Sequence, residues 1–321
     1  MTRRKVFIWA DADEKIGYGH FIRCLALADM LKDDFDCTFF TQSPTDYQIT
    51  ETKKICYCYA LPSNDTKFSL FLDNLTGEEI VVLDNYFFTS EYQKLVKKKG
   101  CKLIAFGSND RHYYADAVIN YTNLLPEQFS KESYTKMCLG LQWTLLRGAF
   151  YQSNTSKCIP NTYAICIGGT DQACYLEIFA KHVQSIDLSA QIRIISTDRI
   201  GLWRIENFIK KGFHVGINLS AEQMAKVFRE SEISIVSASG VAIEALSQSN
   251  NVIAGYYVHN QVNMYNTLKS NNYIWPLGNF AESNLSMRLK NAIHSIHYGK
   301  SKRPYEQGNT IQKYKQLFHS L

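Results

Sequence analysis

Short apolar runs alternate with amphipathic helical patterns along the chain, and this alternation limits the possible folds more than any other feature. In the first half, apolar runs typical of strands lie at 6–10, 37–41, 55–60, 80–84, 102–106 and 117–120. Helical patterns lie near 21–32, 65–74 and 89–99. The last of these begins with Ser90 and Gln93 at capping-box spacing and ends at Gly100. Strands that alternate with helices predict a parallel sheet covered on both faces.

The second half repeats the alternation after a polar stretch. Strands are predicted at 163–167, 191–195, 214–218, 233–237 and 252–256, with helices near 172–186, 199–211, 220–230, 240–249, 261–271, 282–296 and 309–319. Polar residues at 151–157, followed by Pro160 and Asn161, indicate a domain boundary. We therefore predict an α/β protein with two Rossmann-like domains, 1–155 and 156–321, facing each other across a cleft. The last helix could pack back on the first domain.

Composition excludes several classes of protein. The apolar fraction of 45% and the charged fraction of 20% are typical of globular proteins. No apolar run reaches the roughly 18–20 residues that span a bilayer, and the basic start at 1–5 leads into a strand rather than a secretory signal. A cytoplasmic location without membrane insertion is expected. The net charge of +5 is mild and shows no basic stripe for nucleic acid.

The nine cysteines are scattered, and Cys56 and Cys58 form a C-x-C pair rather than the C-x-x-C of zinc or redox sites. We interpret them as reduced, structural thiols. The pattern predicts neither a metal site nor a cofactor, and we expect a monomer.

A glycine-rich turn with a histidine follows the first strand. It consists of Gly17, Tyr18, Gly19 and His20, with Arg23 one helical turn further. Where a strand ends and a helix begins, backbone N–H groups and the helix dipole favour anions such as phosphates. A histidine there can move a proton at neutral pH. An ordinary glycine turn remains an alternative.

Polar residues also follow the other predicted strands, and the carboxyl ends of parallel strands meet at one edge of a sheet. These residues are Asp11 and Asp13; Asp84, Asn85 and Tyr86; 107–110; Gly168, Gly169, Thr170 and Asp171; Ser237, Ser239, Gly240 and Glu244; and His259, Asn260 and Gln261. Each group has a structural alternative: a tight turn for the glycines, an N-cap for the serines, an exposed first-turn position for Glu244 and packing for Tyr86.

His20 could serve two roles. If the ligand is a sugar nucleotide, a neutral imidazole could take a proton from water that attacks the anomeric carbon. Helix termini and Arg23 could then offset the charge of the departing diphosphate. Alternatively, His20 could bind a phosphate and transfer no proton.

The ordered motifs resemble a known family. They are GYGHFIRCLALADML at 17–31, Asp84-x-Tyr86 after a VVL strand, CIGGTD at 166–171, SASGVAIEAL at 237–246 and Asn260-Gln261 before a helix. A further stretch at 143–151 looks like the family's L-R-x-x-F segment. From about residue 6 to 273, the chain resembles the PseG-type UDP-sugar hydrolases of pseudaminic acid biosynthesis, relatives of the MurG-like glycosyltransferases with the GT-B fold.

The resemblance implies metal-independent hydrolysis of UDP-2,4-diacetamido-2,4,6-trideoxy-β-L-altropyranose to UDP and free sugar, with His20 as the base. It implies catalytic roles for Tyr86 and Asn260. The residues expected to bind UDP or sugar are Asp13, Gly17, Tyr18, Gly19, Arg23, Asp84, Gly168, Gly169, Thr170, Asp171, Ser237, Ser239, Gly240, Glu244 at the ribose, and Gln261.

Two positions depart from the family pattern. Asn85 stands where the family usually has His, and Gly107 and Ser108 stand where it usually has an acidic pair. Because both lie near the expected sugar pocket, they leave the sugar itself open. A glycosyltransferase that uses a UDP-sugar donor and a non-catalytic UDP-sugar-binding protein remain alternatives.

Overall fold

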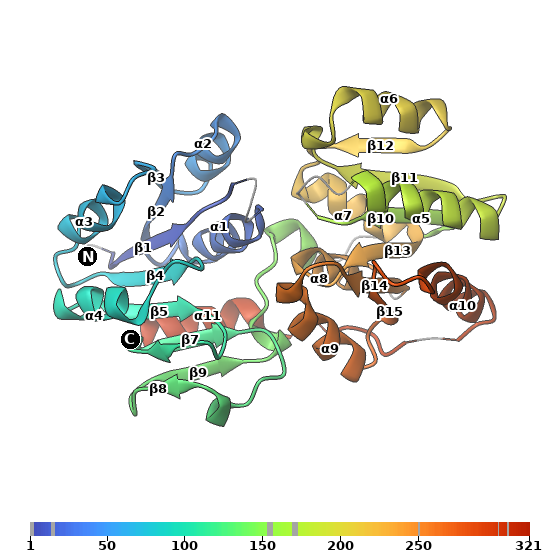
Figure 1. The fold of residues 1–321 in the computed structure, drawn as a ribbon. Coiled ribbons are helices and arrows are strands. Elements are labelled where there is room, and N and C mark those ends of the chain that lie inside the picture. Colours follow the sequence, from blue (N-terminus) through green and yellow to red (C-terminus); the bar gives the residue numbers. More distant parts are fainter. Residues whose placement is uncertain are drawn as a thin grey trace. The chain divides into compact units, whose positions relative to one another are not determined.

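The computed structural model describes residues 3–13, 17–152, 157–168, 173–249, 251–300, 302–306 and 308–321 (Figure 1). The chain divides into two compact units. Unit 1 comprises Met1–Arg147 and Gly308–Leu321, and unit 2 comprises Gly148–Gln307. The sequence predicts the division at 155/156 instead. The shift has a local cause, because the carbonyl of Phe150 accepts a hydrogen bond from Gln248 Nε2 and so attaches the turn at Gly148–Tyr151 to unit 2.

Unit 1 is built on a parallel sheet in the order β3-β2-β1-β4-β5-β7-β9. Its strands are β1 (Lys5–Ala10), β2 (Asp36–Gln42), β3 (Tyr57–Leu61), β4 (Ile80–Asp84), β5 (Lys102–Phe106), β7 (Ala117–Asn120) and β9 (Lys136–Leu139), and β6 (His112–Tyr113) pairs separately with β8 (Ser130–Lys131). Ala10 lies opposite Asp84 in the register. The residues that follow β1 and β4 therefore emerge side by side at one edge of the sheet.

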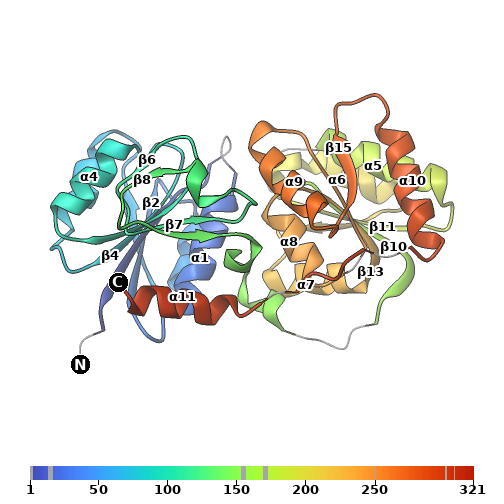
Figure 2. The same ribbon diagram turned by 90° about the horizontal axis from the view of Figure 1, so that it is seen from below.

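The helices of unit 1 include one from the end of the chain. They are α1 (Gly19–Leu31), α2 (Asp46–Lys53), α3 (Thr66–Asp73), α4 (Ser90–Lys98) and α11 (Thr310–His319), with short 3-10 turns η1 (Pro126–Gln128) and η2 (Leu141–Trp143). Figure 2 shows α11 running beside α1. The Phe318 ring packs 5.9 Å from that of Phe35, and Tyr314 Oη donates to Trp143 O at 2.6 Å. These contacts fasten the last helix to unit 1.

Unit 2 has a second parallel sheet, in the order β12-β11-β10-β13-β14-β15. Its strands are β10 (Ile159–Cys166), β11 (Gln191–Ser196), β12 (His214–Ile217), β13 (Ser231–Ser237), β14 (Val252–Tyr256) and β15 (Trp275–Asn279). The helices are α5 (Ala173–Ile186), α6 (Leu202–Lys210), α7 (Ala221–Glu230), α8 (Gly240–Leu246), α9 (Val262–Ser270) and α10 (Leu285–His297), with 3-10 turns η3 (Gly148–Tyr151), η4 (Asp198–Ile200) and η5 (His259–Gln261).

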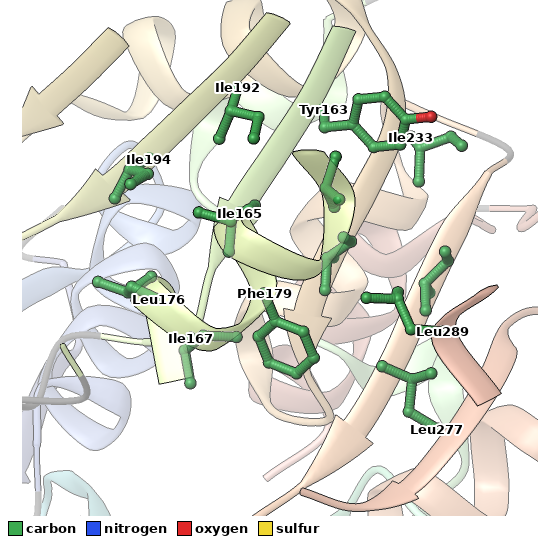
Figure 3. Packing of buried hydrophobic residues seen from close by; sticks show 14 of the residues in the cluster. Tyr163, Ile165, Ile167, Leu176, Phe179, Ile192, Ile194, Ile233, Leu277 and Leu289 are labelled. Atoms are coloured by element: carbon green, nitrogen blue, oxygen red, sulfur yellow. The ribbon is translucent and has the colours of Figure 1, made fainter. Parts of the chain in front are cut away.

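The core of unit 2 follows from the two-residue period of its central strand. Tyr163, Ile165 and Ile167 point to one face of the sheet, where they meet Leu176 and Phe179 of α5 (Figure 3). All are buried, and each large apolar side chain removed from water stabilises the unit by about 1.5–3 kcal/mol. Packing on this face holds the end of β10 and the start of α5 in place.

The predicted α/β class is confirmed, since every pairing within the two main sheets is parallel. The sequence pattern did not predict α2, β9, β15 or the two-residue strands β6 and β8. Pro276 and Gly278 lie inside β15 and interrupt the residue pattern typical of a strand. Because β15 is an edge strand, the missing N–H of Pro276 is tolerated. The signal for α2 was present in Thr45 and Gln48, which form a capping box. Among the described residues, no helix is both long and apolar enough to cross a membrane.

Candidate active site

Four of the expected site residues lie between the end of β1 and the first residue of α1, namely Asp13, Gly17, Tyr18 and Gly19. Gly17 has a φ of 73°, a conformation that favours glycine, and its N–H donates to Asp13 O at 2.9 Å. Tyr18 precedes the first residue of α1, and its side chain makes no capping hydrogen bond to that helix. A Cβ added to Gly19 would meet no described atom within 4 Å. Within the described part of the chain, the backbone at the start of α1 therefore has room beside it for a ligand atom.

His20 lies in the first turn of α1, and its partner comes from β4. The ring atom Nδ1 is 2.7 Å from Oδ1 of Asp84, a residue 1% exposed. Arg23 binds the same carboxylate in a bidentate manner, with Nε 2.5 Å from Oδ2 and Nη2 2.5 Å from Oδ1. Register and helical spacing cause this meeting, because Asp84 ends the strand beside β1 and Arg23 follows His20 by one turn.

The charge of Asp84 determines which nitrogen of His20 carries the proton. Burial would raise the pKa of Asp84, but the charges of Arg23 and His20 and the hydrogen bonds from both outweigh burial and hold that pKa well below its usual range. An ionised carboxylate only accepts hydrogen bonds, so Nδ1 of His20 must be the donor at 2.7 Å. The 3.0 Å contact between Nδ1 and Arg23 Nη2 is then not a donation to the ring. In the neutral imidazole the basic lone pair lies on Nε2.

Cys24 completes the surroundings of Asp84, with Sγ donating to Oδ2 at 3.2 Å. Burial, and secondly the charge of Asp84, raises the pKa of this thiol well above its usual value, so it remains protonated. Both oxygens of Asp84 are thus engaged by protein groups. This geometry favours a role in orienting His20 over the ligand contact that the sequence suggested for Asp84.

Tyr86 is the exposed member of the His20 group. Its ring centroid lies 4.7 Å from that of His20 in an edge-on arrangement, and the residue is 53% exposed. The Tyr86 N–H donates to its neighbour Asn85 Oδ1 at 2.7 Å. The structure therefore brings together His20, Arg23, Asp84 and Tyr86, four of the expected site residues of unit 1.

Asn85, one of the two departures from the family pattern, forms a structural link. Its Nδ2 donates to Oδ2 of Asp11 at 2.9 Å, while Asp11 Oδ1 accepts from Gln42 N at 2.6 Å. Burial raises the pKa of Asp11, although these hydrogen bonds oppose the shift. The sequence places Asp11 at the end of the first strand and predicts no role for it. Its position directly after a buried strand was the available signal.

In unit 2, the expected residues lie where β10 and β13 end. Gly168 has a φ of 108°, and Ser237 Oγ donates to Ile167 O at 3.2 Å. Ser237 Oγ and Ser239 Oγ are 3.2 Å apart. Three of the expected residues (Gly169, Thr170 and Asp171) lie outside the described part of the chain. The hydrogen bond from Ser237 to Ile167 shows that the described ends of β10 and β13 lie beside each other at this edge of the sheet.

The helix α8 begins directly after these serines. Gly240 is its first residue, and a Cβ added there would meet no described atom within 4 Å. Glu244 lies one turn later and is 8% exposed. The alternative of a fully exposed first-turn glutamate is therefore wrong. A carboxylate one turn from a helix start can accept hydrogen bonds from ligand hydroxyl groups.

Asn260 and Gln261 lie in η5, after β14. Gln261 is buried, and its Oε1 accepts a hydrogen bond from Tyr257 N at 3.2 Å, so this side chain holds its own turn together. Asn260 is exposed. Within the described ranges, no group of three or more His, Cys, Asp or Glu side chains is placed to hold a metal ion.

Comparison with solved structures identifies the class of fold as GT-B, in which each half of the chain is Rossmann-like. MurG of Acinetobacter baumannii has a TM-score of 0.62 at 12% identity, with 99% of this chain and 100% of that chain covered. The UDP-GlcNAc 2-epimerase of Methanocaldococcus jannaschii, in complex with UDP-GlcNAc and UDP, has a TM-score of 0.62 at 12% identity, with coverage of 99% and 100%. HepE of Anabaena, in complex with UDP, has a TM-score of 0.63 at 9% identity, with coverage of 98% and 100%.

Sequence comparison is more specific. The chain is 28% identical over 275 residues to the UDP-2,4-diacetamido-2,4,6-trideoxy-beta-L-altropyranose hydrolase of Campylobacter jejuni, covering 80% of this chain and 93% of that protein. The resemblance seen in the motifs is thus confirmed. An uncharacterized protein of Methanocaldococcus jannaschii is 24% identical over 263 residues, which are 75% of this chain and about half (53%) of that protein. No protein-family model matches the chain.

Proposed function

We propose that this protein hydrolyses a UDP-linked 2,4-diacetamido-2,4,6-trideoxyhexose to UDP and the free sugar. The observation that carries the proposal is the His20–Asp84 pair at the open start of α1, in a chain 28% identical to a hydrolase of such a substrate. We further propose a place in pseudaminic acid biosynthesis in the cytoplasm. The proposal specifies the chemical class of the sugar and no single stereoisomer. The reason is that Asn85, near the expected sugar pocket, stands where the family pattern usually has His.

In the proposed mechanism, Nε2 of His20 takes a proton from water as the water oxygen forms a bond to the anomeric carbon. The bond from that carbon to the diphosphate oxygen breaks, and UDP leaves with the electron pair. Asp84 holds Nδ1–H, which keeps the basic lone pair on Nε2. A general base positioned in this way contributes about 10²–10⁴-fold in rate. Tyr86, which lies beside the His20 ring, and Asn260 are proposed to contact the reacting sugar.

We assign UDP binding to the expected residues of unit 2. Gly168, Ser237, Ser239 and Gly240 would offer backbone and hydroxyl donors to the diphosphate, because a helix start favours anions. Glu244 would accept hydrogen bonds from the ribose hydroxyl groups. The turn at Gly17–Gly19 would contact the substrate from α1. Metal independence is part of the proposal and is tested by activity in the presence of EDTA.

One alternative has an observation in its favour, namely the likeness in fold to MurG. A glycosyltransferase would use the same UDP-sugar donor but would need an acceptor other than water. Acceptor-dependent release of UDP would therefore favour the transferase over the hydrolase.

The test is to incubate the protein with a panel of UDP-sugars in ¹⁸O-labelled water and to identify the products by mass spectrometry. We expect UDP release without an acceptor, with the label in the free sugar. The His20→Ala variant should release UDP at least 10²-fold more slowly while still binding UDP. Label in UDP, or equal rates for His20→Ala and the parent protein, would contradict the mechanism.

A further inference from the structure

We infer that Arg23 is a positioning residue: its bidentate contact holds the Asp84 carboxylate that orients His20, and its positive charge opposes the negative charge of Asp84 beside the ring. For its kinetic consequence, the inference rests on the proposed function. The charge pairing itself is a property of the folded protein and can be measured without substrate.

The first step is geometric. Arg23 uses both Nε and Nη2 on the two oxygens of Asp84, at 2.5 Å each. Its side chain is 30% exposed, whereas that of Asp84 is 1% exposed. The guanidinium also lies 5.4 Å from the ring centroid of Phe106 and 5.8 Å from that of Tyr121. The carboxylate of Asp84 and the two aromatic rings together fix the plane of the guanidinium group. The charge of Arg23 therefore stays beside His20 rather than moving out to solvent.

The second step is electrostatic. A buried carboxylate alone beside an imidazole stabilises the imidazolium form, which has no lone pair with which to accept a proton. Arg23 Nη2 lies 3.0 Å from the same ring nitrogen that contacts Asp84. Its permanent positive charge opposes the negative charge of Asp84 at nearly the same distance. His20 therefore receives the orientation that a carboxylate provides, while the charges of Asp84 and Arg23 oppose each other beside its ring.

Other titratable groups also lie near the His20 ring. Cys24, on α1, is held neutral because burial raises the pKa of its thiol. Burial also raises the pKa of Tyr121, which follows β7, so its phenol is neutral too. Tyr86, after β4, presents its ring edge to His20. Asp11, after β1, is engaged by Asn85 and Gln42. Among these described neighbours, Asp84 and Arg23 are the charged groups in direct contact with His20.

The test measures the titration of the His20 ring by NMR in the full-length protein, with the resonance assigned from its loss in His20→Gln. In Arg23→Gln, no positive charge opposes the negative charge of the Asp84 carboxylate. We therefore expect the midpoint of the His20 titration to move by about one pH unit to higher pH. In Asp84→Asn, no negative charge opposes the positive charge of Arg23, and the midpoint of the His20 titration should move to lower pH. In the double variant, both charges are absent and the midpoint should return toward that of the parent protein.

Two further variants serve as controls. Arg23→Lys keeps the charge, so its midpoint should stay near the parent value. Arg193→Gln breaks another partly buried ion pair, with Glu230 at 2.9 Å in unit 2, and should leave the midpoint unchanged. If Arg23→Gln does not fold, the comparison of Asp84→Asn with the double variant still decides the question, because the midpoint rises again in the double variant only if the charge of Arg23 acts on His20. An unchanged midpoint in the folded charge variants, or an equal shift in Arg193→Gln, would overturn the inference.

A kinetic measurement separates this inference from the proposed function. If the protein releases UDP, the acid limb of kcat/KM against pH should move with the NMR midpoint, giving up to tenfold lower kcat/KM for Arg23→Gln on that limb. If the parent protein releases no UDP from any UDP-sugar, the proposed function is wrong, and the NMR titration still decides whether Arg23 balances Asp84. A shifted NMR midpoint with an unmoved acid limb would overturn the kinetic part alone.

Discussion

The hydroxyl group of Tyr113 occupies the space that any side chain at residue 107 would need. A Cβ built on Gly107 would lie 1.9 Å from Tyr113 Oη, and the same hydroxyl donates to Ser108 O at 2.6 Å. Asn120 Nδ2 donates to Gly107 O at 2.7 Å. The turn at 107–108 is thus held by hydrogen bonds that need no carboxylate, which explains structurally how this chain accommodates Gly and Ser where the family pattern is acidic.

This contact predicts that Gly107→Ala is destabilising. The added methyl group must displace the buried Tyr113 ring, and overpacking of this kind costs about 1–3 kcal/mol. The measurement is the urea midpoint of unfolding at pH 7. Gly19→Ala is the matched stability control, because its Cβ meets no described atom within 4 Å. A midpoint for Gly107→Ala equal to that of Gly19→Ala would show that Tyr113 moves at no cost.

Asp84→Asn should lower stability in a way that depends on pH. Because the pKa of Asp84 is held well below its ordinary value of 3.8, its ionised form stabilises the folded state above that pH, and this stabilisation is lost as the pH falls below it. Removing one partner of a buried ion pair costs about 3–5 kcal/mol. Urea unfolding should therefore show the largest difference from the parent protein at pH 6–7 and a smaller one below about pH 4.

The control for this pH dependence is Asp33→Asn, which changes an exposed carboxylate after α1. It should alter the urea midpoint little at either pH. A difference between Asp84→Asn and the parent protein that is the same at pH 7 and at about pH 2 would mean that the charge of Asp84 does not stabilise the fold.

Glu244→Gln should weaken UDP binding. In the proposed ribose site the Glu244 carboxylate loses its charge in this variant, and hydrogen bonds to charged groups are worth about 1.5–3 kcal/mol. We expect roughly tenfold weaker binding of UDP by calorimetry. Glu282→Gln, which removes a half-exposed partner of Arg288 in the same unit, should bind UDP as the parent protein does. Unchanged affinity in Glu244→Gln would remove Glu244 from the ribose site.

Phe318→Ala should destabilise unit 1, although it lies at the end of the chain. The ring is 0% exposed and packs against Phe35, and truncating a buried Phe costs about 3–5 kcal/mol. Hydrogen exchange measured by mass spectrometry should rise in peptides from α1 and η2, which α11 contacts. Ile311→Ala, at a position 37% exposed, should change exchange much less. Faster exchange confined to unit 2 would contradict the assignment of α11 to unit 1.

Much of the architecture could be predicted from the sequence, because strand and helix periods are local properties. The runs at 6–10 and 80–84 are nearly all apolar, as strands buried on both faces must be, and both became central strands of unit 1. The edge strand β15 was missed because Pro276 and Gly278 interrupt its pattern. Edge strands need less regular sequences, since one side of the strand makes no sheet hydrogen bonds.

The candidate site was only partly predictable, for a different physical reason. By itself, the sequence determined the α/β class, the turns at the ends of the strands and the identity of His20, Asp84 and Glu244 as candidates. Only the tertiary structure decided their partners. The register Ala10↔Asp84 brings His20 and Asp84 together across 64 positions of sequence, and makes Arg23 a partner of Asp84. Strand order and register decide such contacts, and neither is encoded in the local periodicity of the chain.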